Sequence, residues 1–189
     1  MTHEIVIAGF GGQGVLSMGK ILAYSGIMEN KEVSWMPSYG PEQRGGTSNV
    51  TVIVSDEPVS SPVVNEYDIA IVLNQPSLDK FASRVKKGGI LIYDPNGIHT
   101  HTDRKDIQIY EVPASEECEK IGNDKTFNMI VLGGVLKVAP MVTLESVIAG
   151  LKKSLPERHH KLIPMNEEAI RRGMEVIRKI DFLLKSQEI

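Results

Sequence analysis

Glycines are the first residues in this sequence whose type and spacing suggest chemistry. Gly9, Gly11 and Gly14 fit the pattern G-x-G-x-x-G, and Gly12 adds a fourth glycine within it. Glycines at this spacing let the backbone turn sharply beneath a ligand, and the N–H groups that open the next helix suit a phosphate. A tight turn that binds no ligand is the alternative, because the spacing by itself is weakly specific.

A dinucleotide site needs an acidic residue near the end of the second strand, about 20 residues beyond the glycines, to bind the ribose hydroxyls. We expect that strand at residues 32–36, with Glu32 at its beginning and Pro37 directly after its end. No Asp or Glu closes the strand, so the sequence argues against NAD or FAD as the ligand.

A second group with binding chemistry is Arg44-Gly45-Gly46, within an expected loop over residues 37–49. Long irregular loops inside a compact domain are often functional. A planar guanidinium beside open backbone N–H groups suits a phosphate or a carboxylate. An ion pair of Arg44 with Glu42 or with a partner subunit explains the residue equally well.

The other reactive side chains do not assemble a catalytic set or a metal site. His99 and His101 are close in sequence, but no cysteine or further histidine is near, which favours a solvated loop over a metal site. Cys118 is the only cysteine and stands among acidic residues, which raise the pKa of a thiol. Lys20 could reach an anion above the glycines, although a surface lysine is the better interpretation. We therefore predict no catalytic residue and no metal ligand.

The bulk composition excludes several classes of protein. The 189 residues suffice for one domain but hardly for two, so we expect residues 1–189 to form a single domain. With a net charge of −3 and no basic stripe, nucleic acid is not an expected partner. No apolar run approaches the roughly 18 residues of a membrane span, and no leader precedes the first strand, so we expect a cytoplasmic protein. One cysteine cannot hold an iron–sulfur cluster, which usually takes four thiolates.

The elements that must position these residues alternate between buried strands and helices. This alternation predicts a Rossmann-like α/β domain of three layers, with a mostly parallel but mixed sheet and helices on both faces. We expect strands at residues 4–8, 32–36, 50–54, 68–73, 90–93 and 107–112, with 50–54 antiparallel to a neighbour and 107–112 at the sheet edge.

Apolar periodicity predicts the helices between these strands. The first begins at Val15 and buries Val15, Met18, Leu22 and Ser25; a short one runs through Phe81 and Val85 and is closed by Gly88-Gly89. Further helices are expected at residues 114–121, 127–138 and 143–155, and the one at 127–138 is expected between the sheet and a partner surface, with Gly133-Gly134 allowing close approach. The last opens at Pro164 and carries an apolar face of Ile170, Met174, Ile177, Ile180 and Leu184.

Two motifs taken together resemble a known family. Residues 9–14 read G-F-G-G-Q-G, and residues 38–48 read S-Y-G-P-E-Q-R-G-G-T-S. In this combination they are similar to the gamma subunit of 2-oxoacid:ferredoxin oxidoreductases. Residues 56–62, 127–129 and 132–133 follow in the order of that family, so the resemblance covers essentially the whole chain.

The resemblance implies a complex that converts a 2-oxoacid, coenzyme A and oxidised ferredoxin to acyl-CoA, carbon dioxide and reduced ferredoxin. It implies thiamine diphosphate held by alpha and beta subunits, and iron–sulfur clusters on beta, delta or fused segments. This chain would hold neither cofactor alone, would be inactive alone, and would contact alpha, beta and delta subunits, with ferredoxin reached through the complex. A free-standing chain of this length is most similar to the 2-oxoglutarate or 2-ketoisovalerate type.

The resemblance also implies a set of site residues, which shape the face next to the other subunits and meet the diphosphate of coenzyme A. They are Gly9, Gly11, Gly12, Gln13, Gly14, Tyr39, Arg44, Gly45 and Gly46. Two rival functions stay open. One is a self-sufficient NAD(P)-binding oxidoreductase with Arg44 on a 2′-phosphate, and the other is a non-catalytic scaffold that retains the glycine turn.

Overall fold

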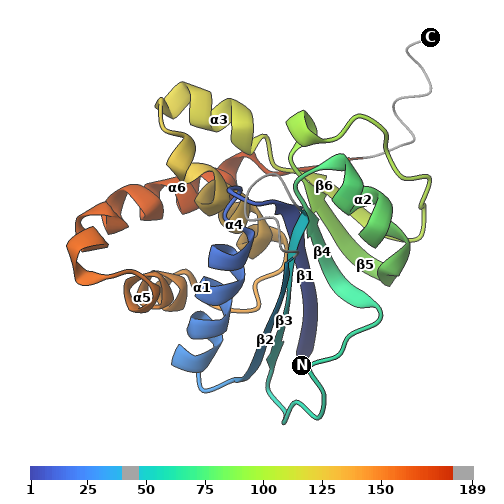
Figure 1. The fold of residues 1–189 in the computed structure, drawn as a ribbon, viewed down its shortest axis with the longest axis horizontal. Coiled ribbons are helices and arrows are strands. Elements are labelled where there is room, and N and C mark those ends of the chain that lie inside the picture. The colour runs from blue at the N-terminus through green and yellow to red at the C-terminus, as the bar shows by residue number, and fades with distance from the viewer. Residues whose placement is uncertain (40–46, 181–189) are drawn as a thin grey trace.

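The computed structural model of the chain describes residues 1–39 and 47–180. Within these ranges one mixed sheet of seven strands has the order β2-β3-β1-β4-β5-β6-β7 (Figure 1). The strands are β1 (Thr2–Phe10), β2 (Glu32–Tyr39), β3 (Thr47–Ser55), β4 (Tyr67–Val72), β5 (Val85–Tyr93), β6 (Gln108–Glu111) and β7 (Arg178–Lys179). The predicted α/β fold with a mixed sheet is confirmed.

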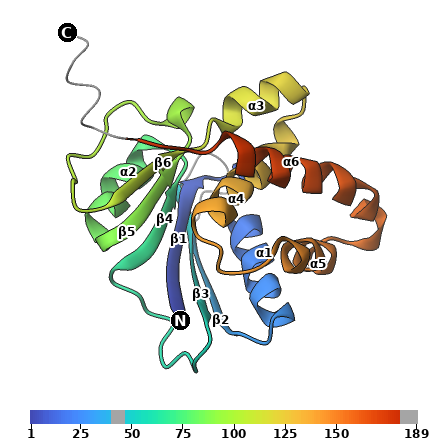
Figure 2. The ribbon, with the colours of Figure 1, turned by 180° about the vertical axis from the view of Figure 1, so that it is seen from behind.

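Helices cover the two faces of the sheet unequally. One face is covered by α1, α3, α4, α5 and α6, and the opposite face by α2 (Figures 1 and 2). Their bounds are α1 (Val15–Met28), α2 (Gln75–Phe81), α3 (Ala114–Ile121), α4 (Phe127–Val138), α5 (Leu144–Ser154) and α6 (Ile163–Val176). Short 3₁₀ turns are η1 (Ala82–Arg84), η2 (Pro95–Gly97), η3 (Asp124–Thr126) and η4 (Glu157–Leu162). Across the described ranges, no helix combines the length and the apolar character needed to cross a membrane.

Strand direction decides where a ligand could bind. β1 is antiparallel to β3 and parallel to β4, and β4, β5 and β6 are parallel to one another. The carboxyl ends of β1, β4, β5 and β6 therefore meet along one edge of the sheet, which is the upper edge in Figure 1. In α/β proteins, ligands bind outside this edge.

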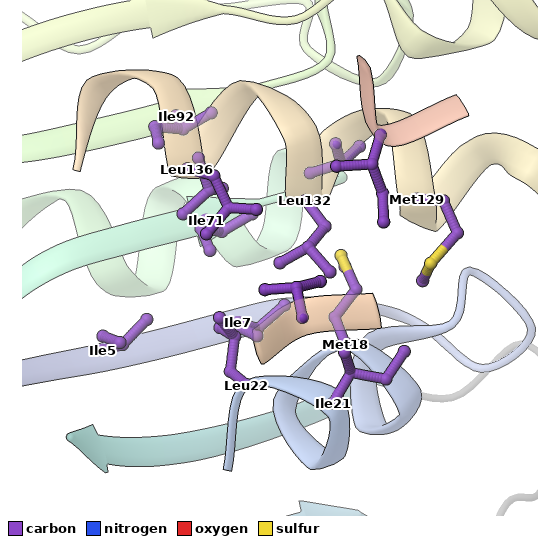
Figure 3. Close-up of a cluster of buried hydrophobic side chains, with 14 of the residues drawn as sticks. Ile5, Ile7, Met18, Ile21, Leu22, Ile71, Ile92, Met129, Leu132 and Leu136 are labelled. Atoms are coloured by element: carbon purple, nitrogen blue, oxygen red, sulfur yellow. The ribbon is translucent and has the colours of Figure 1, made fainter. Parts of the chain in front are cut away.

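The larger core lies between the sheet and the five helices (Figure 3). β1 alternates, so that Ile5 and Ile7 point to this side while Val6 and Ala8 point to the core under α2. The predicted inner face of α1 is confirmed, because Met18 and Leu22 are fully buried against the sheet and α4. This packing fixes the position of the N-terminus of α1 relative to the end of β1.

Glycines allow α4 and α6 to pack with their backbones in contact. A Cβ built on Gly133 would lie 1.9 Å from the carbonyl oxygen of Ile170, and one built on Gly173 would lie 1.8 Å from that of Ile130. We predicted that Gly133-Gly134 permits close approach to a partner surface. The close contact of Gly133 is instead with α6 of the same chain.

The hairpin of β2 and β3 is longer than predicted. The prediction ended the strand at Met36 and placed residues 37–49 in a loop, but β2 continues through Pro37 to Tyr39 and β3 begins at Thr47. Proline lacks the N–H that a central strand needs, yet it is tolerated in an edge strand. β2 is such a strand, because it pairs only with β3 among the described residues.

The glycine pair at residues 88–89 was wrongly predicted to close a helix. β5 begins at Val85, directly after η1, and includes both glycines. Gly88 has φ +79°, and the register of β4 against β5 shifts between Tyr67 and Ile69. The pair therefore accommodates an irregularity within a strand.

The last predicted helix was too long. α6 ends at Val176, so Ile177 and Ile180 do not extend its apolar face, and Leu184 lies outside the described residues. The chain turns instead into β7, which pairs antiparallel with β6. As a result β6 has neighbours on both sides, and its predicted position at the sheet edge was wrong.

Candidate functional site

The glycine turn, residues 9–14, connects β1 to α1 at the carboxyl edge of the sheet. Gly12 and Gly14 have φ +102° and +76°, a backbone region that residues with a Cβ rarely adopt. A Cβ on Gly14 would lie 2.5 Å from the side-chain nitrogen of Asn128, whereas one on Gly12 would meet no atom of residues 1–39 and 47–180 within 4 Å. Both positions favour glycine by conformation, and of the two it is Gly12 that has no described neighbour in this direction.

The side chain of Gln13 holds the turn in place. Its Oε1 accepts a hydrogen bond from the backbone N–H of Phe10 at 2.7 Å, and its Nε2 donates to the carbonyl of Leu73 at 3.1 Å. A Cβ on Gly9 would lie 2.5 Å from that Oε1, so Gly9 makes room for the Gln13 amide. Gln13 therefore fastens the turn to the end of β4, and both ends of its amide are bonded within the chain.

The N-terminus of α1 is open to an anion. Gly14 is the N-cap residue, no side chain caps the helix among the described residues, and the first turn contains no acidic residue. The first N–H groups of a helix have no carbonyl partner within it, and the helix dipole adds a partial positive charge. A phosphate above Gly12 and Gly14 would meet these donors directly.

A cleft of about 490 Å³ opens above the turn, between the start of α1, α3, η3 and the first turn of α4. We call it the glycine-turn cleft. Lys125 supplies a cation to its wall, and Glu119 and Asp124 supply carboxylates. It is lined by Gly12, Gln13, Gly14, Ser115, Cys118, Glu119, Asp124, Lys125, Phe127 and Asn128. Backbone N–H groups of the turn, the ammonium group of Lys125 and side-chain amides thus line the same cleft.

Below the cleft, the hydroxyl of Ser115 donates a hydrogen bond to Asp94, the residue that follows β5. Asp94 is buried, and burial raises the pKa of its carboxyl above the usual range, against the opposing effect of the Ser115 hydroxyl and nearby backbone amides. Because the Ser115 hydroxyl donates its proton to the hydrogen bond with Asp94, it has no proton to donate to a ligand in the cleft. Toward the cleft, this hydroxyl offers only lone pairs, which suit an N–H or O–H group of a ligand.

Cys118 lines the same cleft but is only 3% exposed. Burial raises the pKa of its thiol, and the charges of Asp124, Asp94 and Glu117 raise it further, while the Thr126 hydroxyl lowers it. The direction agrees with the prediction, although burial rather than the neighbouring acids is the main cause. Such a thiol is a poor nucleophile at neutral pH.

The predicted site residues fall into four groups. Gly12, Gln13 and Gly14 line the cleft, whereas Gly9 lies beneath the Gln13 amide and Gly11 is exposed on the turn. Tyr39 ends β2, and its backbone pairs with Ser48. Arg44, Gly45 and Gly46 lie outside the described residues. The two strand ends that flank them do lie near the glycine turn, because Thr47 pairs with Phe10 at the end of β1.

Strand order also bears on the NAD(P) alternative. In the dinucleotide-binding fold, the strand after the first helix lies next to the first strand, and its last residue binds the ribose. Here the antiparallel β3 lies between β1 and β2. The end of β2 is therefore two strand spacings, about 9–10 Å, from β1. Strand position and the missing acid both argue against a dinucleotide.

The histidines predicted to lie in a solvated loop do not form a metal site with other described residues. The backbone N–H of His99 donates to the side chain of Gln75 at 2.8 Å, and Nδ1 of His101 lies 3.2 Å from the hydroxyl of Tyr93. In residues 1–39 and 47–180 there is no group of three or more His, Cys, Asp or Glu side chains placed to hold a metal ion.

Sequence reasoning missed Ser115 and Lys125 on the far wall of the cleft, and it used Asn128 only as part of the family-like run 127–129 without assigning it to the site. They come from segments more than a hundred residues beyond the turn, so no local motif connects them with it. Lys20, which could reach an anion or lie on the surface, is exposed and lines a neighbouring groove instead of the glycine-turn cleft.

Comparisons with known proteins identify the family of this chain. A family model described as pyruvate ferredoxin/flavodoxin oxidoreductase matches residues 4–176. The ketoisovalerate oxidoreductase subunit VorA of Methanothermobacter thermautotrophicus is 40% identical over 93% of this chain, which spans only 36% of that longer protein. The 2-oxoglutarate synthase subunit KorC of Methanocaldococcus jannaschii is 33% identical over 95% of this chain and 96% of its own length.

Solved structures show the same fold. The gamma subunit of a keto/oxoacid ferredoxin oxidoreductase from Geobacter sulfurreducens superposes with a TM-score of 0.79 at 28% identity, over 93% of this chain and 96% of that one. A 2-oxoglutarate:ferredoxin oxidoreductase from Magnetococcus marinus has a TM-score of 0.84 at 21% identity and shares the fold over 96% of this chain and 32% of its own.

Proposed function

Because this chain belongs to the pyruvate ferredoxin/flavodoxin oxidoreductase family, we propose that it is the gamma-type subunit of a thiamine-dependent 2-oxoacid:ferredoxin oxidoreductase. The complex oxidatively decarboxylates a 2-oxoacid to acyl-CoA and passes the electrons to ferredoxin in the cytoplasm. This chain contributes subunit packing and a binding surface for coenzyme A. Alpha, beta and delta subunits are its partners.

The observation that carries the coenzyme A proposal is the open N-terminus of α1 beneath a bare Gly12. A diphosphate placed there would accept hydrogen bonds from backbone N–H groups that have no partner in the helix. Lys125 in the cleft wall would add a positive charge, and the Asn128 amide would add further donors. Gln13 acts by positioning the turn, since its own amide is already bonded to Phe10 and Leu73.

Arg44, Gly45 and Gly46 complete the proposed site. The strand ends on either side of their segment, at Tyr39 and Thr47, lie at the sheet edge where the glycine turn begins. An arginine from this segment would pair with a phosphate group in the geometry that guanidinium favours.

The redox and thiamine chemistry belongs to the partner subunits. With one cysteine in its sequence, this chain cannot supply the four thiolates of an iron–sulfur cluster. The thiol it has is buried with a raised pKa, and the described residues contain no metal-binding group. No step of electron transfer or decarboxylation is therefore assigned to its side chains.

We propose 2-oxoglutarate or 2-ketoisovalerate as the substrate, since relatives that carry those names align over nearly the whole of this chain. The test is to purify the assembly through a tag on this chain and assay the reduction of ferredoxin with separate 2-oxoacids, with and without coenzyme A. We expect activity that needs both coenzyme A and one of these two acids. The isolated chain should be inactive and colourless, and turnover by it alone would refute the proposal.

Coenzyme A binding is tested separately by Arg44→Ala in the assembled complex. A raised KM for coenzyme A, with an unchanged KM for the 2-oxoacid and unchanged subunit composition, is expected. Arg171→Ala is the matched control, because Arg171 is exposed on α6, pairs with Glu167 of the same helix and does not line the glycine-turn cleft. If Arg44→Ala leaves the KM for coenzyme A unchanged, the proposal that Arg44 binds coenzyme A is refuted, and the non-catalytic scaffold is favoured instead.

A further inference from the structure

A second groove adjoins the glycine-turn cleft along the side of α1. It has a volume of about 520 Å³ and lies between α1, the start of α4, the end of α5 and the start of α6. We call it the lateral groove. Its apolar lining consists of Ile21, Met129, Leu151, Leu155, Leu162 and Met165. Among the described residues, Lys20 and Lys125 are its two cations and no carboxylate lines it.

The chain that borders this groove is strongly cationic. Residues 152–161, the cationic segment, contain Lys152, Lys153, Arg158 and Lys161 against the single acid Glu157. That is a net charge of +3 with neutral histidines, in a chain whose total is −3. All four cations are exposed, and the segment runs from the last turn of α5 through η4. Positive charge is thus concentrated at one corner of an acidic protein.

These cations are not used within the described chain. Elsewhere arginines pair with acids, as Arg104 does with Asp106 and Arg172 does with Glu117. None of the four cations of the segment forms an ion pair with any residue in the described ranges. Single lysines such as Lys87 and Lys105 are unpaired there as well, but the segment gathers four such cations within ten residues. Arg158 instead donates to the imidazole of the neighbouring His159 at 3.1 Å.

One histidine of the same segment, His160, keeps it against the end of α5. Nε2 of His160 lies 3.0 Å from the carbonyl of Lys152 and 3.1 Å from that of Leu155. The exposed ammonium and guanidinium groups are therefore carried on a backbone fixed beside the groove. Both ribbon views place this corner at the end of the helical layer away from α2 (Figures 1 and 2).

We propose that the lateral groove and the cationic segment dock an acidic, amphipathic segment of another subunit of the complex. Its apolar side chains occupy the groove, and its carboxylates pair with the cations of residues 152–161. A protein segment fits better than a small anion, because the charges extend along ten residues and most lie outside the groove. Charge of this kind sets the partner and its orientation more than the total affinity.

The proposal rests on the assembly proposed above.

The test uses the assembled complex, purified through a tag on this chain and treated with a carbodiimide that joins lysines to carboxylates at contact distance. We expect Lys152, Lys153 or Lys161 to be linked to Asp or Glu residues within one short stretch of a single partner subunit. If these lysines form no link to another subunit, the docking proposal is wrong. Nucleic acid bound at this corner, shown by lysines that become labelled only after nuclease treatment, would overturn it as well.

A charge reversal measures the contribution of the segment. K152E/K153E should raise the dissociation constant of the cross-linked subunit about tenfold at roughly 50 mM salt and much less at about 0.5 M, because screening removes the attraction. K87E/K105E is the matched control, since it changes the net charge equally at exposed lysines outside the segment. Equal effects of the two pairs would refute the proposal.

The outcomes separate this proposal from the function on which it rests. A tagged chain that brings down no other subunit contradicts the proposed complex itself. A complex that assembles and is active, but in which K152E/K153E changes nothing and no inter-subunit link forms, contradicts only the docking surface.

Discussion

Replacing Gly133 by alanine tests the helix crossing that supports the wall of the glycine-turn cleft. Phe127 and Asn128, which line the cleft, belong to the first turn of α4, and α4 is held by its contact with α6. At the crossing, Gly133 faces the carbonyl oxygen of Ile170. Nothing except hydrogen fits between the two backbones.

The size of the effect follows from that contact. A Cβ at position 133 would lie 1.9 Å from the Ile170 oxygen, whereas a carbon–oxygen contact needs about 3.3 Å, so the helices must separate by about 1.4 Å. Overpacking usually costs about 1–3 kcal/mol and occasionally more, and because this contact has to move backbone we expect about 3–4 kcal/mol. Alanine recovers about 1 kcal/mol of helix propensity. We expect a net loss of about 2–3 kcal/mol in the free energy of unfolding.

Urea unfolding of the full chain, followed by circular dichroism, measures this loss, which should also lower the Tm by about 5–10 °C in a protein of this size. Gly26→Ala in α1 is the control, because its Cβ would meet the side-chain methyl groups of Val33 at 2.8 Å and Val54 at 3.3 Å rather than a carbonyl. Side chains can move, so we expect a change within about 1 kcal/mol. If the two variants were equally stable, the close backbone contact of α4 and α6 would not exist.

Three further predictions concern the cleft. Gly12→Ala should raise the KM of the complex for coenzyme A about tenfold or more in steady-state assays, with the KM for the 2-oxoacid unchanged, because its methyl group enters the space proposed for the diphosphate. Gln13→Ala should lower the free energy of unfolding in urea by about 1–3 kcal/mol, since Phe10 N–H and the Leu73 carbonyl lose their partner; a change near zero would show that water replaces the amide. Asp94→Asn should flatten the pH dependence of the free energy of unfolding. In the wild type the pKa of Asp94 in the folded state is raised above its usual 3.8, so the folded state binds this proton more tightly than the unfolded state does. The stability of the wild type therefore falls as the pH rises from 3.8 through the raised pKa. An unchanged slope above pH 3.8 would contradict the raised pKa.

Elements with a strong local pattern were predictable from the sequence. The run Ile5-Val6-Ile7-Ala8 before the glycines predicted β1, and the apolar spacing after them predicted the buried face of α1. The predicted helix over residues 127–138 has the observed bounds of α4, because its residues are apolar on most sides. In these segments, propensity and burial favour the same structure.

The wrong predictions occurred where tertiary contacts override the local pattern. Ile177 and Ile180 continue the helical spacing of α6, but pairing with β6 takes the chain into a strand instead. Pro37 suggested the end of a strand, yet an edge strand tolerates it. The Gly88-Gly89 pair has the composition of a helix end, and only the register between β4 and β5 shows its actual use.

For a similar reason, only one wall of the candidate site could be predicted from the sequence. One wall is a contiguous motif, so Gly12 and Gly14 could be identified from spacing alone. The opposite wall consists of Ser115, Lys125 and Asn128, which are ordinary surface residue types without a shared motif. They reach the turn only because α3 and α4 pack on the same face of the sheet as α1.

The position of β3 between β1 and β2 makes the glycine turn of this chain better suited to a ligand other than a dinucleotide. With β3 antiparallel between β1 and β2, the position of the ribose acid is lost, while the turn and the open end of α1 are unaffected. Contacts within the chain also hold the turn, because Gln13 donates a hydrogen bond to the Leu73 carbonyl at the end of β4 and Asn128 packs on Gly14. A preorganised anion site loses little entropy on binding. In the proposed complex, this turn would hold the phosphate end of coenzyme A while another subunit handles its reactive end, and this division would require no catalytic side chain on this chain.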